Sequence, residues 1–282
     1  MNKPLTAAFH TYPRGWPGPL GWERLRRKWH QFNSGRALRK GMERFGVETQ
    51  RGRHDVPTTA DIAVMWSWKQ PAVIETMLST GRHVLVIERG FIQPRNEWYT
   101  LTLDGFNGRG RFAPSGDLGE RWERNFAHLM KPWRRGGDYA LVIGQVPGDA
   151  ALHGTNIVAW AQDVTTRLVA RGERVVYRPH PKGPTPCPAG ATLSTGSLAE
   201  DFLGASRVVT FNSTTAVEAV LAGIPTVVTD NGSVAYPMAT HTVEEEPVRP
   251  DRIEWSHDLA WRQWSLEELA DGTAWSHVRK AL

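Results

Sequence analysis

The sequence predicts an α/β fold with two Rossmann-like domains. Short β-branched runs alternate with helical segments along most of the 282 residues, a pattern typical of parallel sheets. A complete strand–helix–strand unit lies in residues 207–230, and a break rich in Pro, Arg and Gly lies at 132–137. We therefore expect a first domain over 1–135, a second over 136–282, and C-terminal helices that cross back onto the first domain.

Composition narrows the class of protein. The chain is 40% hydrophobic and 22% charged, so it can build sizeable cores and is not a candidate for disorder. A single cysteine, Cys187, excludes a disulfide framework and a cysteine-rich metal site. The sequence shows no long apolar run and no signal peptide before Pro13, so we expect a cytoplasmic protein without a membrane span. The net charge of +5 permits a polyanionic partner.

The first elements of the chain combine a strand with a basic helix. Residues 5–12 read as a strand, and the Gly- and Pro-rich loop that follows carries Trp16. Residues 22–45 read as a helix with many cations, among them Arg27 and Lys28. A solvated helix face is the simpler interpretation, and a surface for an acidic polymer is the alternative.

Two further strands are expected at 61–66 and 83–87, with a helix over 70–79 between them. Glu88 follows the second of these strands directly, where open α/β sheets hold their ligands, so its carboxylate could serve as a catalytic base. The alternative is a carboxylate paired with the adjacent Arg89. The long loop after it carries Trp98, and loops of this length are often functional.

The second domain begins with a strand at 138–143, which ends at Gly144 and Gln145. After a helix over 156–170, a strand at 174–177 leads into the sequence RPHPK. Two prolines fix the backbone of this turn and display two cations and an imidazole, which suits a phosphate. These three side chains are Arg178, His180 and Lys182.

Residues 207–230 form the most informative stretch. A strand at 208–211 is followed by a helix from 214 to 221, a cap at Gly223 and a parallel strand at 226–229. Helix N–H groups and hydroxyls at this position favour an anion, and Glu218, one turn further, could bind a ribose. The alternative is a capped helix whose hydroxyls satisfy only the backbone. The expected phosphate contacts are Asn212, Ser213, Thr214 and Thr215.

The order of three motifs resembles a known family. A strand ending in ERGFI, a strand followed by RPHP, and the unit FNSTTAVEAVLAGIPTVV occur in this order. This order is similar to that of capsule-type glycosyltransferases of GT-B fold, namely the Kdo transferases and, more distantly, bacterial sialyltransferases. Phage-encoded sugar transferases are similar too. The resemblance extends over about residues 137–236.

The resemblance implies two domains facing a cleft, with a UDP- or CMP-sugar donor held mainly by the second. His180 would contact the donor phosphate, together with the hydroxyls of residues 213–215, and Glu218 would reach the ribose. The family places an acidic base in the first domain, where Glu88 is the nearest match and Asp104 the second candidate. No DxD pair follows a strand, so we expect no metal and no cofactor, with Arg178 and Lys182 stabilising the leaving phosphate.

The acceptor stays open at this point. A hydroxymethylated base of phage DNA, flipped and stacked on Trp16 or Trp98, would use the basic segment with Arg27 and Lys28. A capsule or lipopolysaccharide acceptor fits the resemblance equally well. A metal-free nucleotide-sugar epimerase and a non-catalytic DNA-binding protein are the other classes that share these features.

Overall fold

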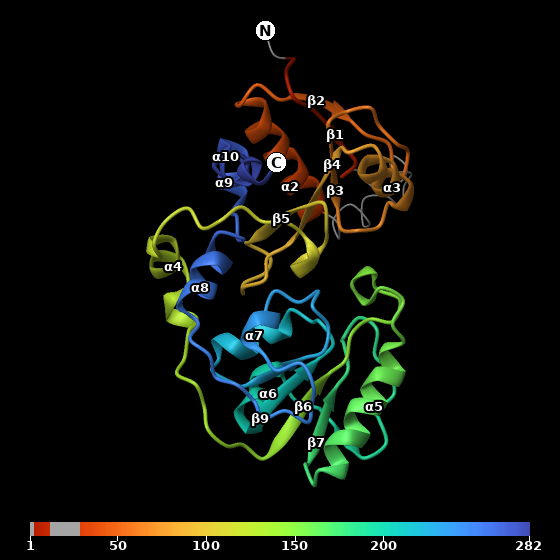
Figure 1. The fold of residues 1–282 in the computed structure, drawn as a ribbon, viewed down its shortest axis with the longest axis vertical. Helices are drawn as coiled ribbons and strands as arrows, with labels where there is room; N and C mark the ends of the chain where they lie inside the picture. Colours follow the sequence, from red (N-terminus) through yellow and green to blue (C-terminus); the bar gives the residue numbers. More distant parts are fainter. Residues whose placement is uncertain (1–2, 12–28) are drawn as a thin grey trace. The chain divides into compact units, whose positions relative to one another are not determined.

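The structure, a computed structural model, describes residues 3–11 and 29–282 and divides into two compact units (Figure 1). Unit 1 comprises Met1–Phe106, Gly110–Leu118 and His257–Leu282, and unit 2 comprises Asn107–Arg109 and Gly119–Ser256. Each unit is built on its own five-stranded sheet with helices on both faces. The predicted α/β fold with two parallel-sheet domains is therefore confirmed.

Unit 1 has the strand order β2-β1-β3-β4-β5. The first four strands are parallel to one another, and β5 runs antiparallel to β4 at the edge of the sheet. Residues 62–65 of β3 and 84–87 of β4 are apolar and buried, as expected for central strands covered on both faces. The five strands are β1 (Thr6–Phe9), β2 (Glu48–Arg51), β3 (Ile62–Trp66), β4 (His83–Arg89) and β5 (Tyr99–Leu103).

The end of the chain helps to close unit 1. Helix α2 (Trp29–Glu43) packs against α9 (Leu266–Asp271) and α10 (Thr273–Val278), while α3 (Pro71–Ser79) lies over the other face (Figure 1). The α2–α9 contact is close because Gly41 has no side chain, and an added Cβ would collide with the backbone carbonyl oxygen of Leu269 in α9. The buried indoles of Trp264 and Trp275 join the core of this unit. The helices that the sequence predicts to cross back onto the first domain therefore do so.

Unit 2 has an all-parallel sheet in the order β10-β9-β6-β7-β8. Along β6, Ala140 and Val142 face α5 (Ile157–Ala170), while Leu141 and Ile143 face α6 (Leu198–Gly204) and α7 (Thr215–Leu221). This alternation places one helix layer on each side of the sheet (Figure 1). The strands are β6 (Tyr139–Ile143), β7 (Val175–Arg178), β8 (Ala191–Leu193), β9 (Ala205–Thr210) and β10 (Thr226–Val228).

Short elements complete the chain. Helix α8 (Ile253–Ala260) begins in unit 2 and ends in unit 1, and α4 (Glu120–Asn125) belongs to unit 2. Within the described ranges, no helix combines the length and the hydropathy needed to cross a lipid bilayer. The 3₁₀ helices are η1 (Asn107–Arg109), η2 (Ala127–Leu129), η3 (Ala150–Leu152), η4 (Tyr236–Met238) and η5 (Arg279–Ala281).

The units divide at residue 118 rather than at the predicted boundary of 135. The reason is the segment around the Pro-, Arg- and Gly-rich break, which bonds to unit 2 through its backbone. Lys131 N donates to Leu221 O at 2.8 Å, and Arg134 N donates to Gly223 O at 2.7 Å. The Pro-, Arg- and Gly-rich segment is therefore a connection that packs along α7. A cluster of turn-forming residues looks the same in the sequence whether the segment packs on a domain or links two domains freely.

We predict that Gly223→Ala destabilises the protein far more than Gly172→Ala. Both glycines have a positive φ, at 73° and 78°, so an alanine costs about 1–2 kcal/mol of backbone strain at either position. A Cβ at Gly223 would also collide with the backbone carbonyl of Pro132, whereas the space around Gly172 is open. Urea unfolding should give a loss of about 1 kcal/mol for Gly172→Ala and about 3 kcal/mol for Gly223→Ala. Equal losses would contradict this reading of the 131–134 contact.

Candidate functional site

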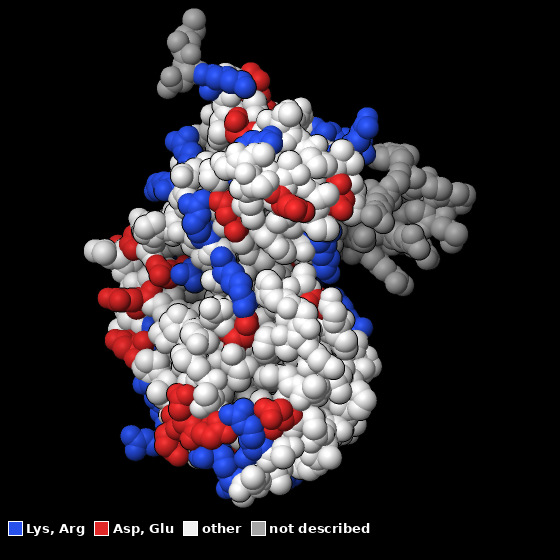
Figure 2. Space-filling model, turned by 45° about the vertical axis from the view of Figure 1, so that its right-hand side comes forward, with Lys and Arg blue, Asp and Glu red and all other residues white. Residues whose placement is uncertain are grey.

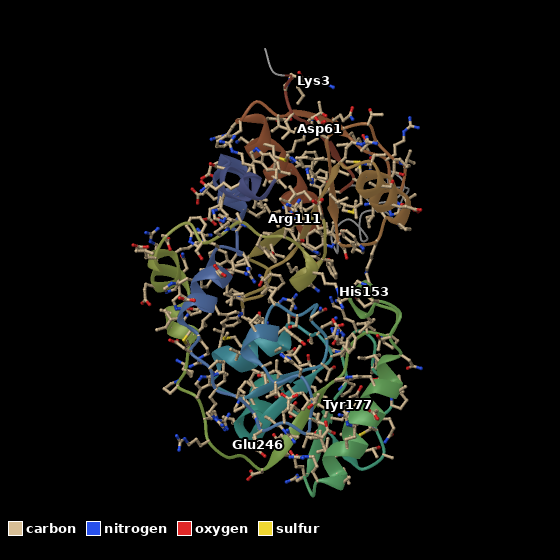
Figure 3. All side chains as sticks on the ribbon, in the orientation of Figure 1. Lys3, Asp61, Arg111, His153, Tyr177 and Glu246 are labelled. Atoms are coloured by element: carbon tan, nitrogen blue, oxygen red, sulfur yellow. The ribbon has the colours of Figure 1, made fainter. Side chains whose placement is uncertain are left out.

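The turns after β7 and β9 lie at the same edge of the unit 2 sheet. Both strands are parallel to β6, which lies between them, so all three end at one edge. Neighbouring strands are about 4.8 Å apart, which puts the RPHP turn and the hydroxyl-rich turn on the order of 10 Å from each other. The β6–α5 loop, which carries His153, leaves the same edge (Figure 3). This is where an open α/β sheet holds a ligand.

The hydroxyl-rich turn, residues 212–215, is half-buried apart from Asn212. Thr210 Oγ1 accepts a hydrogen bond from Ser213 N at 3.0 Å, and Ser213 Oγ accepts one from Thr215 N at 3.2 Å. Ser213 Oγ also lies 3.1 Å from Thr215 Oγ1. Thr214 is the N-cap residue of α7, but its side chain makes no capping hydrogen bond. The Ser213 hydroxyl therefore supports the backbone of the turn, and the Thr214 hydroxyl does not.

Glu218 lies on the first turn of α7, four residues after Thr214 and on the same side of the helix. It is half-buried, in keeping with a position beside the turn rather than inside the core. Its contact with a ribose stays a prediction.

The RPHP turn fixes the imidazole of His180. Its Nδ1 accepts a hydrogen bond from the backbone N–H of Lys182 at 3.1 Å. A neutral ring that accepts at Nδ1 carries its proton at Nε2. The ring is half-buried and the Lys182 side chain is exposed. The contact of both groups with an anionic ligand stays a prediction.

The guanidinium group of Arg178 is bound by other groups of the protein. Its Nη1 lies 2.7 Å from Asp201 Oδ2 and 2.7 Å from Gly196 O, and Asp201 Oδ2 also accepts a hydrogen bond from Ser194 Oγ. Asp201 is buried, and no sequence motif marks it as part of the site. The ion pair connects Arg178, the last residue of β7, to Asp201 in the first turn of α6. Arg178 therefore stabilises the RPHP turn through contacts with the protein.

Gln145 and Asn212 form a buried pair beneath the hydroxyl-rich turn. Gln145 Nε2 donates to Asn212 Oδ1 at 2.8 Å, and Asn212 N donates to Gln145 Oε1 at 3.0 Å. Asn212 Nδ2 donates to Ala151 O at 2.6 Å. The two side chains are only 8% and 3% exposed. The structure therefore places these two expected donor contacts inside the protein, where they link two loops of the site.

Position 144 requires a glycine because Tyr177 of β7 packs closely against it. A Cβ at this position would collide with the hydroxyl of Tyr177, a residue labelled in Figure 3, and would lie 3.3 Å from Arg178 O. The Tyr177 hydroxyl is itself hydrogen-bonded to Thr185 Oγ1. The glycine thus has a packing reason that is independent of any ligand.

In unit 1, Glu88 lies at the carboxyl end of β4, at the edge where β1 and β3 also end. Burial raises the pKa of its carboxyl group above the ordinary value, and this outweighs hydrogen bonds from Ser67 and Arg89 N and the charges of Arg95 and Lys69. Ser67 has φ 62°, a conformation that non-glycine residues adopt rarely and that is common at functional sites. No sequence motif marks Ser67 as a functional residue.

Asp104 lies at the opposite edge of the same sheet. Because β5 is antiparallel, its end pairs with the start of β4, where Leu103 faces Leu85. The Asp104 carboxylate binds Val84 N and His83 Nδ1, each at 2.8 Å, and also Arg111, which Figure 3 labels. Burial alone would raise the pKa of Asp104, but these three partners lower it below the ordinary value. The structure does not bring Asp104 and Glu88 together, and only Glu88 is at the edge where the parallel strands of this sheet have their carboxyl ends.

The expected acceptor contacts are only partly described. Trp98 is half-buried and packs on Gly90, two residues beyond Glu88, where an added Cβ would lie 2.7 Å from the Trp98 Cβ. Trp16, Arg27 and Lys28 lie outside the described residues. Within residues 3–11 and 29–282, no three His, Cys, Asp or Glu side chains are grouped closely enough to hold a metal ion. Metal independence stays a prediction.

Two solved structures share the fold of this chain. The beta Kdo 2,7 transferase of KpsC from Thermosulfurimonas dismutans is 14% identical, with a TM-score of 0.57, over 96% of this chain and 98% of that chain. The beta Kdo 2,4 transferase of KpsC from the same organism is 14% identical, with a TM-score of 0.56, over 90% of this chain and 89% of that chain. No protein-family model and no curated protein matches the sequence. The chain has the GT-B fold, as its motifs predict.

We predict that Glu88 makes the stability of the protein fall as pH rises. A carboxyl group whose pKa is raised by folding binds its proton more tightly in the folded state, so folding loses stability from about pH 4.5 up to the raised pKa. Glu88→Gln removes this loss. Urea unfolding of both proteins between pH 4.5 and 8 should show the variant gaining on the wild type as pH rises. Parallel curves would show that the carboxyl group is not perturbed.

Proposed function

We propose that this protein is a glycosyltransferase that moves a sugar from a nucleotide-sugar donor to an acceptor hydroxyl. The observation that carries the proposal is the placement of His180 and the hydroxyl-rich turn at one edge of an all-parallel sheet. The GT-B fold, shared with two Kdo transferases, supports the same reaction class.

In the proposed complex, unit 2 binds the phosphate of a UDP- or CMP-sugar. The Nε2–H of His180 and the hydroxyl of Thr214 donate hydrogen bonds to phosphate oxygens, and Lys182 supplies a positive charge. Glu218 accepts hydrogen bonds from the ribose. These donors stabilise the negative charge that develops on the leaving phosphate, and no metal ion or cofactor is required.

The proposed base is Glu88. Its carboxylate takes the proton of the acceptor hydroxyl as that oxygen attacks the anomeric carbon and the nucleotide leaves. A raised pKa suits this role, because a stronger base accepts the proton more readily near neutral pH. Arg178, which is paired with Asp201, positions the RPHP turn rather than contacting the phosphate directly.

The proposed acceptor is polyanionic, and an acidic glycan is the form that we favour. On the face that Figure 2 shows, the acidic and basic side chains of the described residues are interleaved and do not form one continuous basic surface. On α2, for example, Arg39 is paired with Glu43. Phosphate contacts with duplex DNA usually need several adjacent cations. The DNA acceptor that the sequence suggests is therefore kept as an outcome of the experiments below.

Replacing His180 or Glu218 by alanine should weaken donor binding. A hydrogen bond to a charged group contributes about 1.5–3 kcal/mol, so the dissociation constant should rise roughly 10- to 100-fold. Calorimetry should first test UDP, CMP, GDP and their sugars with the wild type, then the best binder with both variants. His128→Ala, which changes an exposed histidine of unit 2, is the matched control. Unchanged affinity in both site variants would defeat the assignment.

Acceptor preference should show in the salt dependence of binding. A glycan acceptor predicts that duplex DNA binds weakly and that sugar transfer to an acidic oligosaccharide continues at 200 mM salt. Tight DNA binding that falls steeply between 50 and 200 mM salt would favour DNA, because phosphate contacts release counterions. Nucleotide release with the sugar returned as an epimer would instead indicate an epimerase.

A further inference from the structure

A carboxylate that the proposed donor site does not use lies directly beside it. Asp230 follows β10, and its side chain is 15% exposed. Its two oxygens accept four hydrogen bonds: from Arg109 Nη1 at 2.9 Å, Arg109 Nη2 at 2.7 Å, Asn212 Nδ2 at 2.9 Å and Gly232 N at 2.9 Å. A carboxylate that accepts four hydrogen bonds has a well-defined position in the structure.

Arg109 reaches Asp230 from 121 residues earlier in the chain. Its segment, η1, belongs to unit 2 although the residues on both sides of it belong to unit 1. Gly108 N donates to Gly232 O at 2.8 Å, and a Cβ at Gly108 would lie 2.8 Å from Ser233 O. A Cβ at Gly232 would collide with the Arg109 guanidinium. The ion pair between Arg109 and Asp230 is therefore accompanied by close backbone contact between Gly108 and residues 232–233, which fixes the relative position of the two side chains.

Asp230 connects this pair to the hydroxyl-rich turn. Its Oδ1 holds Asn212 Nδ2, and Asn212 also binds Gln145 and Ala151. Asn212 immediately precedes Ser213, the first hydroxyl of the turn. A displacement of Asp230 would remove one of the two hydrogen bonds that Asn212 Nδ2 donates, and the turn would lose part of its support.

The charge of Arg109 matters as much as its position. Burial alone would raise the pKa of Asp230, but hydrogen bonds from Arg109, Asn212 and Gly232 N lower it below the ordinary value. Asp230 is therefore ionised near neutral pH. Without Arg109, this negative charge would face an anionic ligand bound at the neighbouring turn, and like charges in a half-buried setting repel strongly.

We propose that Arg109 and Asp230 are positioning residues of the donor-phosphate site: Asp230 holds the Asn212 support of residues 213–215, and Arg109 neutralises Asp230 so that an anion can bind. The inference rests on the proposed donor site. It assigns a role in donor binding to a loop whose residue Arg109 is distant in sequence from every motif of that site.

The test measures the affinity of the best-binding nucleotide for three variants. Arg109→Ala leaves the Asp230 charge uncompensated, so the dissociation constant should rise at least tenfold. Asp230→Asn removes that charge and keeps a similar shape, so the rise should be only a few-fold. In the double variant, Asp230→Asn should restore much of the affinity that Arg109→Ala loses. A role confined to stability would not produce this rescue.

Arg167→Ala is the matched control. Arg167 also makes a two-pronged ion pair in unit 2, with Glu244, but that pair is remote from the strand ends of the site. Its loss should lower the melting temperature slightly and leave nucleotide affinity unchanged. Equal effects of Arg109→Ala and Arg167→Ala on affinity, or no rescue in the double variant, would overturn the inference.

Hydrogen exchange gives a readout that needs no ligand. Asp230→Asn should speed exchange at the amides of residues 213–217, and Arg167→Ala should not. Failure of the wild type to bind any nucleotide would defeat the proposed function and with it the role of Arg109 in donor binding. Unchanged exchange at these amides in a wild type that does bind nucleotide would defeat only the inference that Asp230 supports the turn.

Discussion

The parallel alignment of β9, β6 and β7 is the constraint on which the site of unit 2 depends. Parallel strands deliver every following turn to one edge, so residues separated by more than thirty positions in the sequence become neighbours. Hydrogen bonds then fix the turns in place, and three buried polar side chains, Asn212, Gln145 and Asp201, make several of them. The cost of burying these groups is offset because each finds partners within the protein.

Much of unit 2 could be predicted from its sequence because local signals and the fold agree there. The β-branched strand, the polar turn, the short helix and the glycine at 223 each favour the same βαβ unit. What could not be predicted is which polar residue faces outward. Asn212 and Ser213 are adjacent and chemically similar, yet one is buried against Gln145 and the other is half-exposed. That difference depends on partners 67 residues away, which no local pattern reports.

Unit 1 shows the same limit in a different form. Glu88 and Asp104 both looked like candidates for the base, and only the direction of β5 separates them. A strand that follows a long loop can be parallel or antiparallel to its neighbour. Because β5 is antiparallel to β4, Asp104 lies at the edge of the sheet opposite to Glu88, where it bonds to His83 and Arg111. The positive φ of Ser67 could not be predicted from the sequence either, because serine has no special preference for this backbone conformation.

The assignment of residues 107–109 to unit 2 has a consequence for how the chain can be divided. Neither unit is a single continuous piece, since unit 2 takes its three-residue η1 segment from between two stretches of unit 1. A fragment that runs from Gly119 to Ser256 would contain the whole sheet of unit 2 but not Arg109. Such a fragment would lack the cation that pairs with Asp230, so any fragment meant to keep both charges of this ion pair must begin before Arg109.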